Sequence, residues 1–202
     1  MNEAIKVMSE RASVRNYEKG RQLPDETLQQ ILELAGKAPS AWNLQHWRFI
    51  VIKTEEQKEK IFPIAYNQQQ VLDASAVILV IGDAEADKSA AEVFAGVPAE
   101  ARDTLLSNIY GAYKRGRDFG EREALKNASL GAMQLMLAAK ALGVDSCPMS
   151  GFDHERITGV LDIPDRFIPV MMITLGYAAA PIEQHGRFAI ETLVMKEKFE
   201  EK

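Results

Sequence analysis

The sequence predicts an α+β fold in which one sheet is covered by helices on both faces. Three observations indicate this: continuous runs of apolar and β-branched residues, segments with apolar residues at helical spacing, and no repeat or low-complexity linker between them. The 202 residues, 47% of them hydrophobic, suffice for one self-contained core. We therefore expect a single domain over residues 1–202.

The N-terminal third predicts two helices separated by an extended stretch. Ile5 and Met8 have helical spacing within residues 2–10. Pro24 is followed by two acidic residues, which favour a helix start, and apolar positions then recur through residue 37. Residues 38–45 are expected to form a loop.

Two strands are predicted next. The sequence WRFIVIK at residues 47–53 is rich in β-formers, and Thr54 then caps a helix with Gln57 at the capping-box position. The run AVILVI at residues 76–81 is apolar without alternation, as in a strand buried on both faces.

The C-terminal half begins with a helical stretch over residues 93–117 that contains Gly96 and Pro98. Residues 121–142 form the most distinct predicted helix, with Gly143 as its terminator. From Ala128 onward it is apolar nearly all round, which indicates burial either in the core or against a second subunit. A short helix over residues 154–161 and a strand over residues 169–175 complete the prediction.

Composition excludes several classes of function. The 24 basic and 29 acidic residues leave a net charge of −5, which argues against nucleic acid as the main partner. A single cysteine excludes an internal disulfide and a cysteine-based zinc cage, and with three histidines we expect no metal site. Apolar runs are shorter than the roughly 20 residues of a membrane span. We expect a cytoplasmic protein without a membrane partner.

No common catalytic or nucleotide-binding motif occurs in the sequence. Cys147 with His154 nearby allows a thiol nucleophile, but a buried small side chain before Pro148 is the favoured interpretation. An enzymatic reaction would therefore depend on a cofactor.

Two polar clusters carry the functional signal. In an extended chain Arg11, Ser13 and Arg15 share one face, where two guanidiniums and a hydroxyl suit a phosphate; a solvated charged loop is the alternative. Between two tryptophans, Asn43 and Gln45 suit a flat, hydrogen-bonding heterocycle; a turn stabilised by serine and asparagine is the alternative.

Together these clusters resemble the FMN-dependent nitroreductase family. Its R-x-S-x-R/K segment is matched at residues 11–15, and its P-S-x-x-N-x-Q-x-W loop by Pro39, Ser40, Asn43, Gln45 and Trp47. Residues 67–75 resemble the stretch before the family's central strand, and residues 148–152 resemble its P-x-x-G-F loop. Arg187 best matches the family's basic residue near the C-terminus.

The resemblance implies a nitroreductase-like fold with a central mixed, mainly antiparallel sheet flanked by helices, assembled as an intertwined homodimer. FMN would lie in two sites at the dimer interface. The helix over residues 121–142 would then form much of that interface, while burial within one subunit stays an equally good interpretation.

The resemblance also assigns roles to residues. The phosphate would lie against Arg11, Ser13 and Arg187, the pyrimidine edge near Arg15, and a backbone N–H of residues 149–151 near flavin N5. The loop at Pro39 would come from the partner. The expected cofactor-binding residues are Arg11, Ala12, Ser13, Arg15, Pro39, Ser40, Asn43, Asn67, Gln70, Pro148, Met149, Ser150, Gly151 and Arg187. Ser40, Trp42 and Asn43 would face the substrate, with plain packing as the alternative for Trp42.

The implied activity is a ping-pong oxidoreductase without a catalytic side chain. NADH or NADPH would reduce the flavin, and a small electron acceptor such as a nitroaromatic, a quinone or a free flavin would reoxidise it. Residues 85–118 are expected to shape the acceptor pocket. The alternatives are dehalogenation or dehydrogenation of a specific metabolite, a non-catalytic FMN storage or sensor protein, and a structural dimer without flavin.

Two positions depart from the family pattern, His46 where proline is frequent and Gln70 where lysine is frequent. A cation beside flavin N1 and O2 stabilises the anionic reduced ring, and neutral Gln70 leaves that stabilisation to Arg15. We predict that Gln70→Lys raises the flavin midpoint potential, measured by anaerobic potentiometry. An unchanged or lower potential would contradict this.

Overall fold

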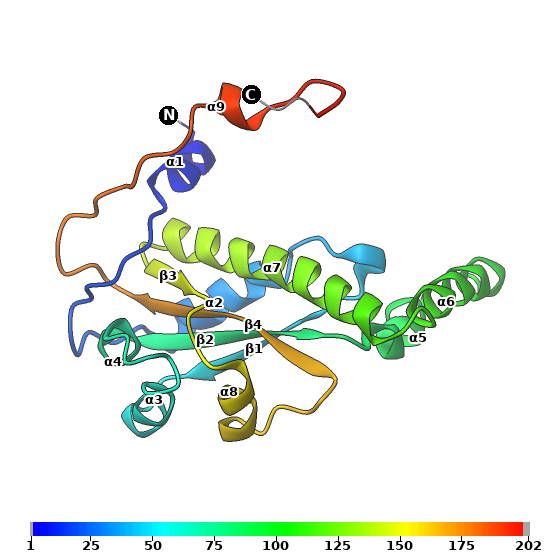
Figure 1. The fold of residues 1–202 in the computed structure, drawn as a ribbon, viewed down its shortest axis with the longest axis horizontal. Coiled ribbons are helices and arrows are strands. Elements are labelled where there is room, and N and C mark those ends of the chain that lie inside the picture. The colour runs from blue at the N-terminus through cyan, green and yellow to red at the C-terminus, as the bar shows by residue number, and fades with distance from the viewer. Residues whose placement is uncertain (1, 200–202) are drawn as a thin grey trace.

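Four strands form the centre of the computed structural model, which describes residues 2–199. They are β1 (Trp47–Ile52), β2 (Ala76–Asp83), β3 (Asp145–Met149) and β4 (Phe167–Gly176). The sheet order is β1-β2-β4-β3, and every neighbouring pair is antiparallel. All eight residues of β2 are buried, because helices cover both faces of the sheet (Figure 1). The predicted strand buried on both faces is confirmed.

The N-terminal segment extends the sheet beyond β3. Ser13 forms a parallel bridge with Ser146, and the Val14 N–H donates to the Ser146 carbonyl at 3.0 Å. Tyr17 forms an antiparallel bridge with Ala178. The expectation of a mainly antiparallel sheet is confirmed; the four strands are all antiparallel, and the parallel pairing is this isolated bridge, which partly covers the free edge of β3.

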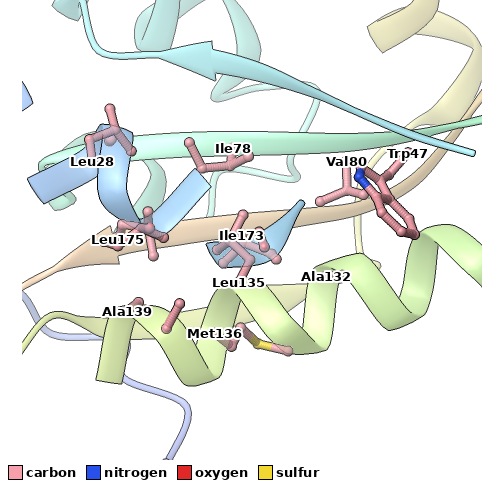
Figure 2. Close-up of a cluster of buried hydrophobic side chains, with 14 of the residues drawn as sticks. Leu28, Trp47, Ile78, Val80, Ala132, Leu135, Met136, Ala139, Ile173 and Leu175 are labelled. Atoms are coloured by element: carbon pink, nitrogen blue, oxygen red, sulfur yellow. The ribbon is translucent and has the colours of Figure 1, made fainter. Parts of the chain in front are cut away.

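One face of the sheet is covered by α2 (Asp25–Ala35) and the long α7 (Arg117–Ala141). Figure 2 shows Leu135 and Ala139 of α7 pointing toward Ile173 and Leu175 of β4. Most of the buried residues of α7 are glycine or alanine, so the helix lies very close to the strands. A Cβ added at Gly120 would lie 2.0 Å from the Ala84 carbonyl oxygen.

The opposite face carries α3 (Glu55–Ile61), α4 (Gln70–Asp73) and α8 (His154–Val160) (Figure 1). The predicted Thr54 cap is present, since its side chain accepts from the Gln57 N–H. Lys58 is buried and donates to the Leu72 and Ala74 carbonyls at 2.9 and 3.0 Å, which ties α3 to the end of α4.

A helical insertion after β2, called the excursion below, projects from one end of the sheet and its covering helices (Figure 1). It contains η2 (Ala86–Ser89), α5 (Ala90–Val93) and α6 (Ala99–Tyr113). The helical stretch expected over residues 93–117 is confirmed only from Ala99 to Tyr113: the chain turns at residues 94–98, and Pro98 becomes the N-cap of α6. Proline lacks the N–H that a helix interior requires, which explains the break.

At the other end, α1 (Glu3–Glu10) and the C-terminal tail with α9 (Ile190–Leu193) lie near each other (Figure 1). The tail is held by Gln184, whose side chain donates to the Ser9 carbonyl at 2.5 Å. No residue of α1 or α9 is buried.

Element boundaries differ from the predictions at two further places. The helix predicted from residue 121 begins at Arg117, and Gly143 follows it with φ +73°, as a helix terminator should. The segment expected as a loop from Pro148 starts inside β3, a strand that the sequence analysis did not predict. Proline within DSCPM disfavours a strand, but β3 is the terminal strand of the sheet and tolerates it.

No helix in residues 2–199 combines the length and apolarity needed to cross a bilayer.

The close approach of α7 to the sheet gives a stability prediction. Gly120→Ala should lower the free energy of unfolding by about 2 kcal/mol or more, because the new methyl group meets backbone that cannot move aside. Gly111→Ala, in α6 with open space around it, should stabilise by about 0.5–1 kcal/mol through helix propensity. Urea unfolding of both variants measures these changes. Equal changes in unfolding free energy for the two variants would contradict the prediction that Gly120 is tightly packed.

Candidate functional site

Three of the predicted site segments meet beside β3. Residues 11–15 run along the strand through the Ser13–Ser146 bridge. Residues 67–70 contact the loop that follows the strand, since the Gln68 amide donates to the Gly151 carbonyl at 2.7 Å. The chain thus brings together segments far apart in sequence that were predicted to bind one ligand.

Burial within the Arg11–Arg15 segment changes most sharply at its end. Val14 is buried with Tyr17 in a small cluster, whereas Arg15 is exposed. Arg11 and Arg15 both lie near Cys147, where their charges oppose the effect of burial that raises the pKa of its thiol. The Nη1 atom of Arg11 is buried and has no hydrogen-bond partner among the described residues. A buried guanidinium nitrogen without a partner is costly, and an anion would supply the missing acceptor.

A hollow of about 320 Å³ lies beside this segment. Its walls come from two parts of the chain, the N-terminal segment and the stretch after β4: Ser13, Val14, Arg15, Asn16, Ala180, Pro181, Ile182 and Glu183. Ser13 and Arg15, two of the three residues predicted on the phosphate-binding face, therefore border open space.

The loop after β3 offers backbone donors. The Phe152 N–H donates to the Ser150 carbonyl at 3.1 Å, which closes a tight turn. The N–H groups of Ser150 and Gly151 have no acceptor among the residues that the structure describes, and both residues are exposed. Two adjacent unpaired N–H groups can bind an acceptor atom of a ligand.

Met149 and Gln70 line the inner side of this region. Both are buried, and the Gln70 Nε2 atom lies 3.2 Å from Gln68 Oε1 and 3.6 Å from Met149 Sδ. Pro148 is half-buried and Asn67 exposed.

Strained backbone marks both loops predicted to bind the flavin. Trp42, Asn43 and Gln45 have φ between +47° and +53°, and Tyr66 and Asn67 have φ of +53° and +55°. Residues other than glycine rarely adopt this left-handed backbone conformation, because it costs about 1–3 kcal/mol per residue. Such strain is typical of binding sites.

The Pro39–Gln45 loop lies apart from the other three segments. Its short helix η1 (Ala41–Asn43) sits near the opposite end of α7 from α1 and β3 (Figure 1). The Ala41 N–H donates to Asn127 Oδ1 at 2.8 Å, and Asn127 Nδ2 donates to the Glu123 carbonyl at 2.7 Å. Asn127 is not among the residues predicted for the site; the available signal is an asparagine directly before the apolar stretch of α7.

Within this loop the predicted residues differ in their surroundings. Trp42 packs on the cluster formed by Leu44 and the α5–α6 excursion, so packing accounts for its position within the chain. The Ser40 hydroxyl accepts from the Gln45 N–H at 3.0 Å. Asn43 and Pro39 are exposed.

Arg187 and Ala12 complete the predicted set. Ala12 is half-buried between the two phosphate candidates. Arg187 is exposed and donates to the carbonyls of His185 and Gly186 in its own tail, at 2.8 and 3.0 Å. No contact with Arg11 or Ser13 is among those found for the described residues, so its role stays a prediction.

Cys147 is almost fully buried, as the favoured interpretation predicted. Burial raises the pKa of its thiol, so the nucleophilic thiolate is disfavoured at neutral pH. His154 stacks on Phe152, with ring centroids 4.3 Å apart.

His46 fixes the start of β1 to the excursion. It is fully buried, and its Nε2 atom lies 2.9 Å from the Tyr113 hydroxyl. Its Nδ1 atom has no partner among the described residues. Burial lowers the pKa of His46 to about 4, so the imidazole is neutral at physiological pH.

An apolar surface runs along the outer side of α7. Leu125, Leu130 and Met133 are each more than 40% exposed. The surface continues into a hollow of about 350 Å³ between α1, α2 and α7, lined mainly by apolar residues: Glu3, Ala4, Val7, Met8, Leu34, Gln134, Leu137, Ala138 and Ala141. Exposed apolar side chains gathered along one helix are typical of a protein–protein interface.

Comparison with known proteins agrees with these features. The model of the nitroreductase family matches residues 8–177. The chain is 42% identical over 196 residues to a Bacillus subtilis protein provisionally named NAD(P)H nitroreductase YodC, covering 94% of this chain and 96% of that one. It is 34% identical over 188 residues to the CLA biosynthesis enone reductase of Lactiplantibacillus plantarum, covering 88% and 87%. A crystal structure of a provisionally named nitroreductase from Exiguobacterium sibiricum, in complex with FMN, superposes with a TM-score of 0.89 at 34% identity, covering 96% of both chains.

The buried neutral His46 predicts a pH dependence of stability. Its folded-state pKa of about 4 lies below the usual 6.5. The contribution of His46 to the free energy of unfolding is therefore complete above pH 6.5 and is lost as the pH falls toward 4. Between pH 7 and pH 4.5 the wild type should lose about 2 kcal/mol more unfolding free energy than His46→Gln. Urea unfolding of both proteins at the two pH values measures the difference. Equal losses of unfolding free energy in the wild type and in His46→Gln would contradict the prediction.

Proposed function

The chain belongs to the nitroreductase family, and we propose that it is an FMN-dependent oxidoreductase that carries electrons from NADH or NADPH to small electron acceptors. The FMN-bound structural neighbour and the relatives named for NAD(P)H support this cofactor and donor.

The observation that carries the proposal is the unpartnered, buried Nη1 atom of Arg11. It lies in a chain of net charge −5, so the positive charge at Arg11 and Arg15 is local and opposes the overall sign. With the Ser13 hydroxyl, these guanidiniums fit the dianionic phosphate of FMN. Arg187 is the further phosphate ligand that we propose.

The loop after β3 fits the ring of FMN. Ser150 and Gly151 present N–H donors, and the apolar side chain of Met149 and the amide of Gln70 lie beside them. FMN, when bound, supplies the redox chemistry by accepting a hydride from the nicotinamide and passing electrons to the acceptor. The chain's own residues bind the phosphate and orient the ring, and none of them is needed as an acid or a base.

The site is completed by a second subunit in this proposal. Pro39, Ser40 and Asn43 lie near the opposite end of α7 from Arg11, so one chain does not bring them to the phosphate-binding segment (Figure 1). The exposed apolar surface of α7 offers the contact through which a homodimer would form. The partner's loop would then cover the ring, as the family resemblance implies.

Donor and acceptor would use the same space in turn, which gives ping-pong kinetics. Nitroaromatics, quinones and free flavins are the acceptor classes that we propose, with the α5–α6 excursion shaping their access. The relative named as an enone reductase supports the alternative of one specific metabolite as acceptor.

The purified protein is expected to be yellow, to release FMN on denaturation and to bleach anaerobically with NADH or NADPH. A colourless protein that takes up no added FMN would contradict the proposal. A yellow protein that neither nicotinamide reduces would indicate a storage or sensor function instead.

Arg11→Ala should weaken FMN binding by about 1.5–3 kcal/mol, roughly 10- to 150-fold, because it removes a charge-assisted hydrogen bond to the phosphate. Arg102→Ala, on the exposed excursion, is the matched control and should leave FMN affinity unchanged. Fluorescence titration of the apoproteins measures both. Equal affinities of the Arg11→Ala variant and the wild type would show that Arg11 does not bind the phosphate.

A further inference from the structure

Three consecutive glutamines, Gln68, Gln69 and Gln70, have different environments. Gln69 is exposed and donates to Asp73 one turn along α4, at 2.8 Å. Gln68 and Gln70 turn toward the loop after β3 and form one hydrogen-bond network with it. Gln68 is absent from the residues that sequence analysis placed at the site.

Both donors of the Gln68 amide are used. Its Nε2 atom donates to the Gly151 carbonyl at 2.7 Å and to the Ala65 carbonyl at 3.1 Å. Its Oε1 atom accepts from Gln70 Nε2 at 3.2 Å. The reversed amide would set its oxygen against two carbonyl oxygens, so the network determines which way Gln68 points.

The network in turn orients Gln70. Its Nε2 atom is occupied by Gln68 Oε1 and Met149 Sδ. Gln70 Oε1 has no partner among the described residues, and it is the end of the amide left for a ligand. Gln70 therefore offers the site an acceptor and withholds its donors.

The same network orients the loop. With the Gly151 carbonyl held by Gln68, and the Ser150 carbonyl by the Phe152 N–H, the carbonyl groups of the turn are occupied and the two unpaired N–H groups remain. Gly151 and the Gln68 amide are closely packed, because a Cβ added at Gly151 would lie 3.3 Å from Gln68 Nε2.

We propose that Gln68 is a positioning residue for the flavin, which fixes the N–H groups of the Ser150–Gly151 turn and the orientation of the Gln70 amide. The inference rests on the proposed function, since it takes FMN as the ligand. Flavin N5 accepts a hydrogen bond in the oxidised ring and carries a hydrogen after two-electron reduction. The family resemblance implies that N5 lies near this turn, where fixed N–H donors would favour the oxidised ring; an acceptor rather than a donor at Gln70 would favour it as well. Gln68 therefore lowers the flavin midpoint potential.

The test replaces Gln68 with methionine, which has similar length and no amide donor. Gln68→Met frees the loop and lets Gln70 rotate, so the balance between oxidised and reduced flavin should shift about tenfold toward the reduced form, a rise of about 30 mV for a two-electron couple. Gln69→Met is the matched control and should leave the potential unchanged. Anaerobic spectroelectrochemistry on the FMN-loaded proteins measures the potentials.

A second readout uses the proteins without FMN. Hydrogen–deuterium exchange at the Phe152 amide should be faster in Gln68→Met than in the wild type, and unchanged in Gln69→Met. Unchanged exchange, or a potential that stays or falls in FMN-loaded Gln68→Met, would overturn the inference. A wild-type protein that takes up no FMN would instead overturn the proposed function, and the claim about the potential with it.

Discussion

The close packing of α7 on the sheet is the constraint on which the other features depend. Gly120 lies against the Ala84 carbonyl, Gly131 against the Trp47 ring, and Gly82 of β2 against Ala124. These contacts leave no room for larger side chains at their positions, so the first part of the inner side of α7 is made mostly of small residues, while Leu135 and Met136 fill the core further along. Leu125, Leu130 and Met133 lie on the outer side. One helix thus supplies both the wall of the core and an exposed apolar surface suited to a second subunit.

That packing also sets where the parts of the site lie. The Arg11–Arg15 segment reaches β3 near the C-terminal end of α7, whereas Asn127, in the N-terminal half of the helix, anchors the Pro39–Gln45 loop. Backbone strain falls in that loop and at Tyr66 and Asn67, beside the turn after β3. The hydrogen bonds of Asn127 and Gln68 offset part of this strain, because each one satisfies backbone groups of a strained or tightly turned segment.

Local sequence signals predicted the regular elements well. Apolar runs located β2 and β4, and the Thr54 cap located α3. The same signals did not predict β3, because Pro148 hides a strand whose formation depends on pairing with β4. They also began the helical stretch at Val93, before the turn at residues 94–98 that precedes α6. For the candidate site, the resemblance pointed to Arg11, Ser13 and Gln70, whose roles stay predictions. Asn127 and Gln68 contact residues far along the chain, at Ala41 and Gly151, and no local pattern reveals such contacts.

The central claim is that each flavin site combines the Arg11 segment of one chain with the Pro39–Asn43 loop of another. Chains carrying Arg11→Ala and Asn43→Ala, co-expressed with different affinity tags, allow isolation of the mixed dimer. The account predicts one FMN bound per mixed dimer with wild-type affinity, because one of its two sites is assembled from intact halves. If each site were built within one chain, every site of the mixed dimer would carry a defect, and the absence of any tightly bound FMN would contradict the account.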